Sequence, residues 1–210
     1  MRFDVIAFDL YGTLLDIGAL ESALGNLTGA PAGPLLAAWR KAQIERTWEL
    51  NRLGEFQPFD QVTAYALSAV APELPRSMRD RMCEAWLTLP AYADAAAAVR
   101  SLGAERCAVL SNGTASMIRS ALSAAGLPIS TVRSVEEVRV YKPDPRVYAL
   151  LDGLAPRERT LFVSANGWDA GGCKRDGRTV AFIDRGGSPP AIEPDLRVTS
   201  LTGLSSRAQQ

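Results

Sequence analysis

Short apolar runs that alternate with helical stretches constrain the fold of this 210-residue chain more than any other feature. Runs of this kind are typical of strands that are buried on both faces of a sheet. Their alternation with helices predicts an α/β fold with a Rossmann-like parallel sheet as its core. The runs, the last of them weak, lie at residues 3–8, 107–110, 131–134, 160–163, 179–183 and 196–198.

One long segment, residues 15–90, interrupts this alternation. Its pattern is helical, prolines cut it into pieces, and it is too long to be a single crossover helix. We therefore expect a core domain of residues 1–14 and 91–210 and an inserted helical cap subdomain of residues 15–90. The tail from Ser205 is expected to fray. Further helices are predicted at about 92–102, 114–125 and 145–153.

Composition narrows the possible chemistry. The chain has no histidine, which excludes Ser-His-Asp and Cys-His catalysis and any metal site that needs an imidazole. Its 23 basic and 23 acidic residues give zero net charge, which argues against a nucleic-acid partner. No apolar stretch approaches the ~18 residues of a membrane helix, so no membrane partner is expected.

The cysteines predict a compartment. Three are present, an odd number without C-x-x-C spacing, and we expect reduced thiols in a cytoplasmic protein. The strand predicted from Phe3 leaves no room for a signal peptide before it, which points to the same compartment.

Polar residues follow the predicted strands where each one ends. In an open α/β sheet, ligands bind outside the carboxyl ends of the strands, so these side chains should converge on one rim. Asp9 directly follows the first strand and can be a turn-capping residue or a carboxylate nucleophile. The order of acid, hydroxyl, amine and acid along the rim favours the nucleophile. The rim residues are Asp9, Ser111, Asn112, Lys142, Ser164, Asn166 and Asp169.

Four segments resemble, in order, the four motifs of the haloacid dehalogenase superfamily. The resemblance is closest to the L-2-haloacid dehalogenases and covers nearly the whole chain; residues 39–43 and 134–145 resemble that branch specifically. The four motif segments are Asp-Leu-Tyr-Gly-Thr-Leu at 9–14, Leu-Ser-Asn-Gly at 110–113, Tyr-Lys-Pro at 141–143 and Val-Ser-Ala-Asn-Gly-Trp-Asp at 163–169.

Tyr11 and the fourth motif separate this chain from the phosphatases of the superfamily. Those phosphatases usually carry a second Asp two residues after the nucleophile, where this chain has Tyr11. They also usually place two acidic residues in the fourth motif, where this chain has Asn166 and Asp169. With Asp9, that leaves two candidate carboxylates, which is few for an octahedral cation. The resemblance therefore implies chemistry on an alkyl halide with no metal and no cofactor.

The implied reaction converts an (S)-2-haloacid into an (R)-2-hydroxyacid and halide. Asp9 would attack C2, displace the halide with inversion and form an ester, which water then hydrolyses. Lys142 would favour the charged form of Asp9, and Asp169 would balance Lys142 and orient the water. Thr13, Ser164 and Asn166 would hydrogen-bond within this network.

The resemblance also implies the residues that bind the substrate. The Ser111 hydroxyl and the backbone N–H groups of Leu10 and Tyr11 would hold its carboxylate. Arg40, from the cap, and Asn112 would receive the halide. The side chains expected to form a dry pocket are Tyr11, Ile44, Phe59 and Trp168, with Tyr148 hydrogen-bonding near Asp9.

Other functions stay open on the same sequence. The first is a hydrolase of another small activated carboxylate, such as fluoroacetate or a cyclic amino acid. The second is a Mg²⁺-dependent small-molecule phosphatase, and the third is a catalytically silent binding protein.

The expected partner is a small-molecule 2-haloacid, and the resemblance and a cap with apolar surface imply a homodimer. Arg133 lies where an apolar strand residue is expected, which indicates an edge strand.

Overall fold

A computed structural model describes residues 3–207, with side chains through Leu204. Within these residues six strands form one parallel sheet in the order β3-β2-β1-β4-β5-β6. Each strand lies where the sequence predicts it, within about two residues, and the α/β fold class is confirmed. The strands are β1 (Val5–Phe8), β2 (Cys107–Ser111), β3 (Thr131–Ser134), β4 (Thr160–Ser164), β5 (Thr179–Ile183) and β6 (Leu196–Val198).

The central strand β1 sets the position of the functional rim. Phe8, the last residue of β1, is level with Val109 of β2 and Val163 of β4. All three side chains are buried, as a strand covered on both faces requires. Because the three strands run in parallel and in this register, Asp9 lies beside the carboxyl ends of both neighbours.

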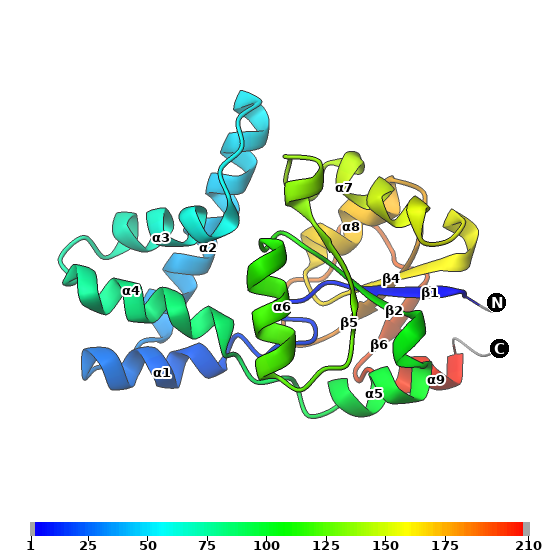
Figure 1. Cartoon of the computed structure of the whole chain (residues 1–210), viewed down its shortest axis with the longest axis horizontal. Coiled ribbons are helices and arrows are strands. Elements are labelled where there is room, and N and C mark those ends of the chain that lie inside the picture. The colour runs from blue at the N-terminus through cyan, green and yellow to red at the C-terminus, as the bar shows by residue number, and fades with distance from the viewer. Residues whose placement is uncertain (1–2, 208–210) are drawn as a thin grey trace.

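Helices cover both faces of the sheet. Figure 1 shows α5, α6 and α9 on one side and α7 and α8 on the other. The predicted helix at 145–153 is α-helical only as far as Ala149 and continues as a 3₁₀ helix, Leu150–Gly153. The α-helices of this part are α5 (Ala95–Leu102), α6 (Ala115–Ala124), α7 (Pro145–Ala149), α8 (Gly167–Arg175) and α9 (Thr202–Arg207).

The end of the described chain corrects one expectation. Residues 205–207 belong to helix α9, so the expected fraying from Ser205 is wrong for them, and residues 208–210 lie outside the described part. Leu201 and Leu204 are fully buried, and α9 packs against α5. This apolar contact holds the last helix on the core.

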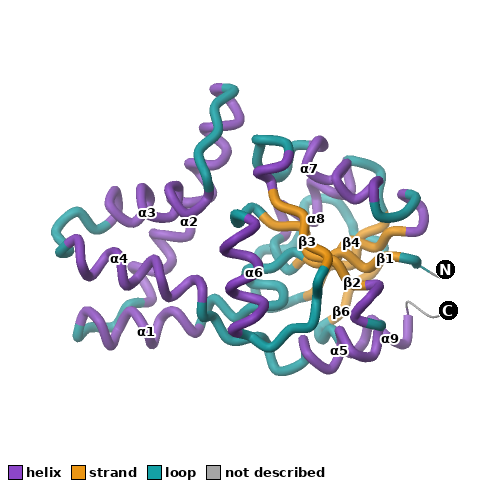
Figure 2. The backbone as a smooth tube through the Cα atoms, viewed as in Figure 1, coloured by secondary structure: helices purple, strands orange, loops and turns teal. Residues whose placement is uncertain are grey.

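Residues 19–87, which we call the helical region, form the second part of the molecule. Figure 2 shows helices and loops there, and the strands gathered on the other side. The backbone N–H of Asp16 donates to the carbonyl of Pro90 (2.9 Å), and that of Tyr92 to the carbonyl of Leu14 (2.9 Å). The chain therefore leaves and re-enters the core side by side, and a subdomain boundary at 15 and 90 stays a prediction. The region contains α1 (Ala19–Thr28), α2 (Gly33–Leu53), α3 (Phe59–Val70), α4 (Arg76–Glu84) and a 3₁₀ turn (Ala85–Leu87).

Arg133 has the environment that the sequence indicates. Its strand, β3, is at one edge of the sheet, and its guanidinium lies 3.7 Å from the carboxylate of Glu137. An edge strand leaves one side open to solvent, so a charged side chain is tolerated there.

Candidate active site

The carboxylate of Asp9 is the centre of a set of polar contacts at the end of β1. Its Oδ1 accepts a hydrogen bond from Lys142 Nζ (3.1 Å). Its Oδ2 accepts from Thr13 Oγ1 (3.0 Å) and from Asn166 Nδ2 (2.7 Å). The side chain is 7% exposed, so these contacts fix its orientation with little competition from solvent.

The turn after Asp9 brings Thr13 back onto the carboxylate. Gly12 has a φ of +85°, and a Cβ there would lie 3.3 Å from Ile17, so glycine fits this turn best. The Thr13 hydroxyl accepts a hydrogen bond from the backbone N–H of Ala165 (2.9 Å). Because that N–H is only a donor, the hydroxyl proton is left to point at Asp9.

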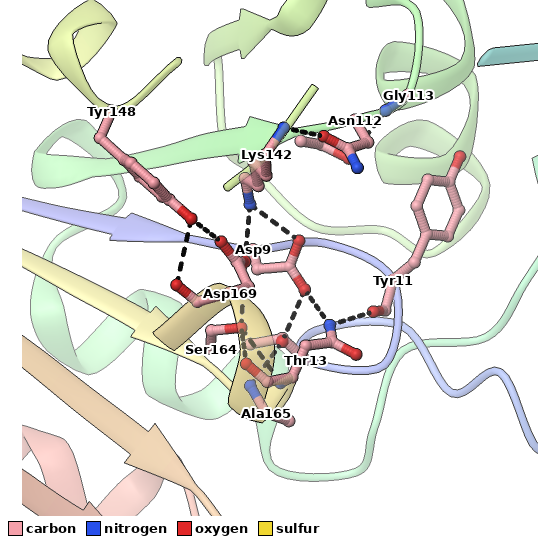
Figure 3. Close-up of polar contacts among 12 residues, drawn as sticks. Asp9, Tyr11, Thr13, Asn112, Gly113, Lys142, Tyr148, Ser164, Ala165 and Asp169 are labelled. Atoms are coloured by element: carbon pink, nitrogen blue, oxygen red, sulfur yellow. Dashed lines mark hydrogen bonds and ion pairs between the residues drawn. The ribbon is translucent and has the colours of Figure 1, made fainter. Parts of the chain in front are cut away.

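Lys142 lies between two carboxylates (Figure 3). Its Nζ is 3.1 Å from Asp9 Oδ1 and 2.8 Å from Asp169 Oδ2, and the residue is 0% exposed. Burial opposes its charged form, but Asp169 and Asp9 outweigh burial and raise the pKa of Lys142. The ammonium is therefore charged at neutral pH and serves as the counter-charge of both acids.

Asp169, in the first turn of α8, accepts hydrogen bonds from three side chains. Ser164 Oγ donates to its Oδ2 (3.2 Å), and the Tyr148 hydroxyl donates to its Oδ1 (2.7 Å). Burial raises the pKa of Asp169 to about 6, against the lowering effect of Lys142. The carboxylate is ionised at neutral pH and takes up a proton under mildly acidic conditions.

Tyr148 differs from the sequence-based expectation. The sequence places it near Asp9 in the substrate site, whereas its hydroxyl contacts Asp169 and it does not line the cavity beside Asp9. The reason is the packing of α7 on α8, where Gly172 leaves the room that the phenol needs. A Cβ at Gly172 would lie 2.7 Å from the Tyr148 hydroxyl.

A small cavity adjoins Asp9, with a volume of about 20 Å³. The sequence predicts every lining residue except Thr47, and the structure brings them together from both parts of the molecule. Leu10, also predicted, is buried in the core, so only its backbone can serve the site. The lining residues are Asp9, Tyr11, Arg40, Ile44, Thr47, Phe59, Ser111, Asn112, Asn166 and Trp168.

Several donors at this rim are available to an anion. Ser111 Oγ accepts from the backbone N–H of Gly113 (3.1 Å), which leaves its own proton for another acceptor. Within residues 3–207, no group accepts a hydrogen bond from the backbone N–H of Leu10 or Tyr11. Asn112 Oδ1 accepts from the backbone N–H of Lys142 (3.1 Å), which leaves its Nδ2 as the free end.

Arg40 brings a positive charge from α2 to the cavity. Its guanidinium carbon lies 5.1 Å from the ring centroid of Trp86, and its Nη1 donates to Gln43 Oε1 (3.1 Å). Burial lowers the pKa of Arg40 to about 10, although Asp9 opposes the shift. The group is charged at neutral pH and faces the cavity that also contains Asp9.

Three residues near the cavity are not predicted as site residues from the sequence. Trp86 packs edge-on against Tyr11, with ring centroids 5.4 Å apart, and no sequence signal links residues so far apart. Thr47 and Gln43 do have a signal. They lie seven and three residues after Arg40 in a predicted helix, and this spacing places all three on one helix face.

Two carboxylates at this rim, Asp9 and Asp169, could serve as metal ligands. In the part of the chain that the structure describes, no cluster of three or more His, Cys, Asp or Glu residues could hold a metal ion. The ammonium of Lys142 contacts both carboxylates, where a bridging cation would need them. The site therefore offers a carboxylate surrounded by one ammonium and neutral donors, beside a cavity that carries a guanidinium.

Known proteins resemble this chain in both sequence and fold. A family model of haloacid dehalogenase-like hydrolases matches residues 3–177. The (S)-2-haloacid dehalogenase 4A of Burkholderia cepacia is 35% identical over 89% of this chain and 85% of its own length. The (S)-2-haloacid dehalogenase 1 of Pseudomonas sp. (strain CBS-3) is 36% identical, with coverages of 96% and 93%. The L-2-haloacid dehalogenase from Xanthobacter autotrophicus with chloropropionic acid covalently bound superposes with a TM-score of 0.93, at 27% identity and over 99% of both chains.

Proposed function

The chain belongs to the haloacid dehalogenase-like hydrolases, and on that premise we propose that it hydrolyses (S)-2-haloacids to (R)-2-hydroxyacids and halide. The observation that carries this proposal is the environment of Asp9, a carboxylate at a cavity wall with an ammonium and neutral donors around it. Tyr11 follows at the position where a phosphatase of this superfamily would carry its acid. The relatives named above share this activity by name, and the Xanthobacter structure contains a covalently bound chloropropionic acid.

The first chemical step forms an ester on Asp9. Oδ2 accepts two hydrogen bonds and Oδ1 one, so Oδ1 keeps a lone pair for attack. Oδ1 attacks C2 from the side opposite the halogen, and the halide departs with the bonding electrons. A halide leaves without a proton, so this step needs no general acid. The presence of Tyr11 in place of a second Asp therefore does not impair it.

The second step restores Asp9. Water attacks the carbonyl carbon of the ester, and the bond from Oδ1 to the Asp9 carbon breaks. The bond from Oδ1 to C2 of the substrate stays intact. One water proton goes to the departing hydroxyacid oxygen and one to solvent. Lys142 and Asn166, which contact the carboxylate, would stabilise the negative charge that develops on it. Asp169 keeps Lys142 in place.

The substrate carboxylate and the leaving halide need separate donors. The Ser111 hydroxyl and the backbone N–H groups of Leu10 and Tyr11 suit the carboxylate. Arg40 and Asn112 Nδ2 suit the halide, since both residues line the cavity and the contact of Lys142 to Asn112 Oδ1 leaves the Nδ2 free to donate. Ile44, Phe59 and Trp168 would exclude water from the reacting carbon.

Release of chloride from the two enantiomers of 2-chloropropionate tests this proposal. We expect chloride from the L isomer alone, at an unchanged rate in EDTA. Fluoroacetate and a panel of phosphate esters with Mg²⁺ are the comparison substrates. Phosphate release that EDTA abolishes, with no chloride release, would replace the dehalogenase proposal with a phosphatase.

A single turnover in water labelled with oxygen-18 tests the covalent step. With enzyme in excess over L-2-chloropropionate, the label should appear in the side chain of Asp9 and not in the first hydroxyacid formed. Label in the first hydroxyacid would mean direct attack by water on C2 and would remove the ester from the mechanism.

The same proposal has four further parts: a cap role for the helical region, metal independence, homodimerisation and a cytoplasmic location. We propose that the helical region acts as a cap over Asp9, because Arg40 and Ile44 of α2 line the cavity. We propose metal independence from the ammonium between the two acids. Homodimerisation is supported by the exposure of Trp48, Leu53 and Tyr65.

A cytoplasmic location is the fourth of these parts. The three cysteines are free thiols, which suits a reducing compartment. No helix within residues 3–207 combines the length and the apolar character that a bilayer crossing requires.

A further inference from the structure

The guanidinium of Arg40 is anchored by a chain of buried neutral groups. Arg40 Nη1 donates to Gln43 Oε1 (3.1 Å), and Gln43 Nε2 donates to Thr63 Oγ1 (2.9 Å). The Trp39 indole donates to the backbone carbonyl of Thr63 (2.9 Å). Trp39, Gln43 and Thr63 are all fully or almost fully buried. The chain therefore links α2, which carries Arg40, to α3.

The chemistry of these groups fixes which way each one points. An arginine only donates hydrogen bonds, so the amide oxygen of Gln43 must face Arg40. The amide NH₂ then faces Thr63, whose hydroxyl oxygen accepts from it. Reversing the amide would place an NH₂ against the guanidinium, so the buried pair has one stable orientation.

The side chain that accepts a hydrogen bond from Arg40 is neutral, although the guanidinium is largely desolvated. Buried charges are commonly paired with an opposite charge. Among the side chains described through Leu204, no carboxylate oxygen lies within 4.0 Å of the Arg40 guanidinium, and Asp9 is the acid whose charge it feels. The positive charge of Arg40 is therefore not neutralised on the side away from the cavity.

We propose that Gln43 is a positioning residue that holds Arg40 in place without neutralising it, so that the full charge of the guanidinium is available to the departing halide. This inference rests on the proposed function, because it takes the halide as the anion that Arg40 receives. A glutamate would make a stronger, charge-assisted bond to Arg40, but the pair would be neutral and would attract an anion less.

The decisive substitution is Gln43→Glu, which changes charge while nearly preserving shape. We expect halide release in a single turnover to slow by about 100-fold, as when a donor to a developing negative charge is removed. The loss should be larger for 2-chloropropionate than for 2-bromopropionate, because chloride is the poorer leaving group. Equal losses for both substrates, or a rate within about twofold of the unmodified enzyme, would overturn the proposal.

Chloride binding gives a readout that does not depend on turnover. The line width of the chloride-35 NMR signal reports weak binding to the protein, and Arg40→Ala defines the loss expected when the site is gone. We expect Gln43→Glu to lose the same excess broadening as Arg40→Ala. Broadening equal to that of the unmodified protein would contradict the proposal.

Thr63→Val is the second variant, and it decides the case if Gln43→Glu does not fold. It removes the acceptor of Gln43 without adding charge, and the melting temperature shows whether the fold is kept. We expect kcat to fall by about tenfold or more with KM nearly unchanged, because the guanidinium is misplaced for the step in which charge develops. An unchanged kcat in folded Thr63→Val would overturn the positioning role.

The two proposals fail in different ways. If the unmodified protein turns over no 2-haloacid but its chloride broadening depends on Gln43 as described, the proposed function is wrong and the role of Gln43 stands. If the protein dehalogenates L-2-chloropropionate and Gln43→Glu behaves like the unmodified enzyme, the function stands and the role of Gln43 is wrong.

Discussion

The side-chain amide of Asn51 pairs with both backbone groups of Tyr141, the residue that precedes Lys142. Asn51 Nδ2 donates to the carbonyl of Tyr141 (2.7 Å), and the N–H of Tyr141 donates to Asn51 Oδ1 (2.8 Å). Asn51 lies in α2 about three helical turns after Arg40 and so on the same face. The pair therefore joins the helix that carries Arg40 to the loop that carries Lys142.

Replacing Asn51 by leucine should destabilise the protein. The buried N–H and C=O of Tyr141 would lose their partners, and we expect the free energy of unfolding to fall by about 2–3 kcal/mol. Urea unfolding measures this change. Asn26→Leu, at an exposed position of α1, is the matched control and should change stability by less than about 0.5 kcal/mol. Equal effects of the two substitutions would show that the Asn51 pair contributes little.

Asp9→Asn should abolish halide release, because an amide oxygen is not a competent nucleophile toward C2. The measurement is chloride release from L-2-chloropropionate, together with circular dichroism to show that the variant is folded. Asp80→Asn, at an exposed site that faces Arg76, is the control and should keep full activity. A folded Asp9→Asn variant with normal turnover would remove Asp9 from the mechanism.

Activity should decline as the pH falls through about 6, where Asp169 takes up a proton. Protonation removes one of the two charges that balance Lys142 and disturbs the contact to Asp9. The pH profile of kcat measures this limb.

The stability of the folded protein should rise, while activity declines, as the pH falls and Asp169 takes up its proton. The folded state binds the proton of Asp169 more tightly than the unfolded chain, whose aspartates titrate near ~3.9. Between about pH 4 and pH 6, this group therefore lowers the free energy of unfolding as the pH rises, and above about pH 6 it has no further effect.

Tyr148→Phe should move the acidic limb of the activity profile to higher pH. The Tyr148 hydroxyl donates to the ionised carboxylate of Asp169, and its hydrogen bond lowers the pKa of that group. Without the bond, the carboxylate takes up its proton more readily. A limb that stays at the same pH would mean that another group controls activity in this range.

Gly172→Ala should reduce both stability and activity. The added Cβ would lie 2.4 Å from Pro143 Cβ and 2.7 Å from the Tyr148 hydroxyl, so the loop after Lys142 or the phenol must shift. Overpacking of this kind costs about 1–3 kcal/mol. Gly153→Ala, where no atom lies within 4 Å of the added Cβ, is the matched control for thermal and kinetic measurements.

The sheet and its rim follow closely from the sequence, because local patterns specify them. A buried parallel strand needs a short apolar run, and the polar residue after it must lie at the carboxyl edge of the sheet. Asp9, Ser111 and Ser164 are adjacent in space for this reason alone. The edge position of β3 explains how its charged residue Arg133 is tolerated.

The contacts within the helical region could not be derived in the same way. A helical period shows which face of α2 is apolar, but it does not show which element covers that face. Trp86 packs against Tyr11 and Arg40, two residues that line the cavity, although it lies far from both in the sequence. The contact of Tyr148 with Asp169 depends on the space that Gly172 leaves on α8, a property of two elements that no single segment reveals.

The volume beside Asp9, about 20 Å³, has a consequence for the catalytic cycle. The lining residues, Arg40 and Phe59 among them, leave little free room beside the nucleophile. A haloacid bound at the nucleophile would therefore contact side chains from both parts of the molecule at once. Any movement of α2 against the sheet would thus change the room that the substrate finds beside Asp9.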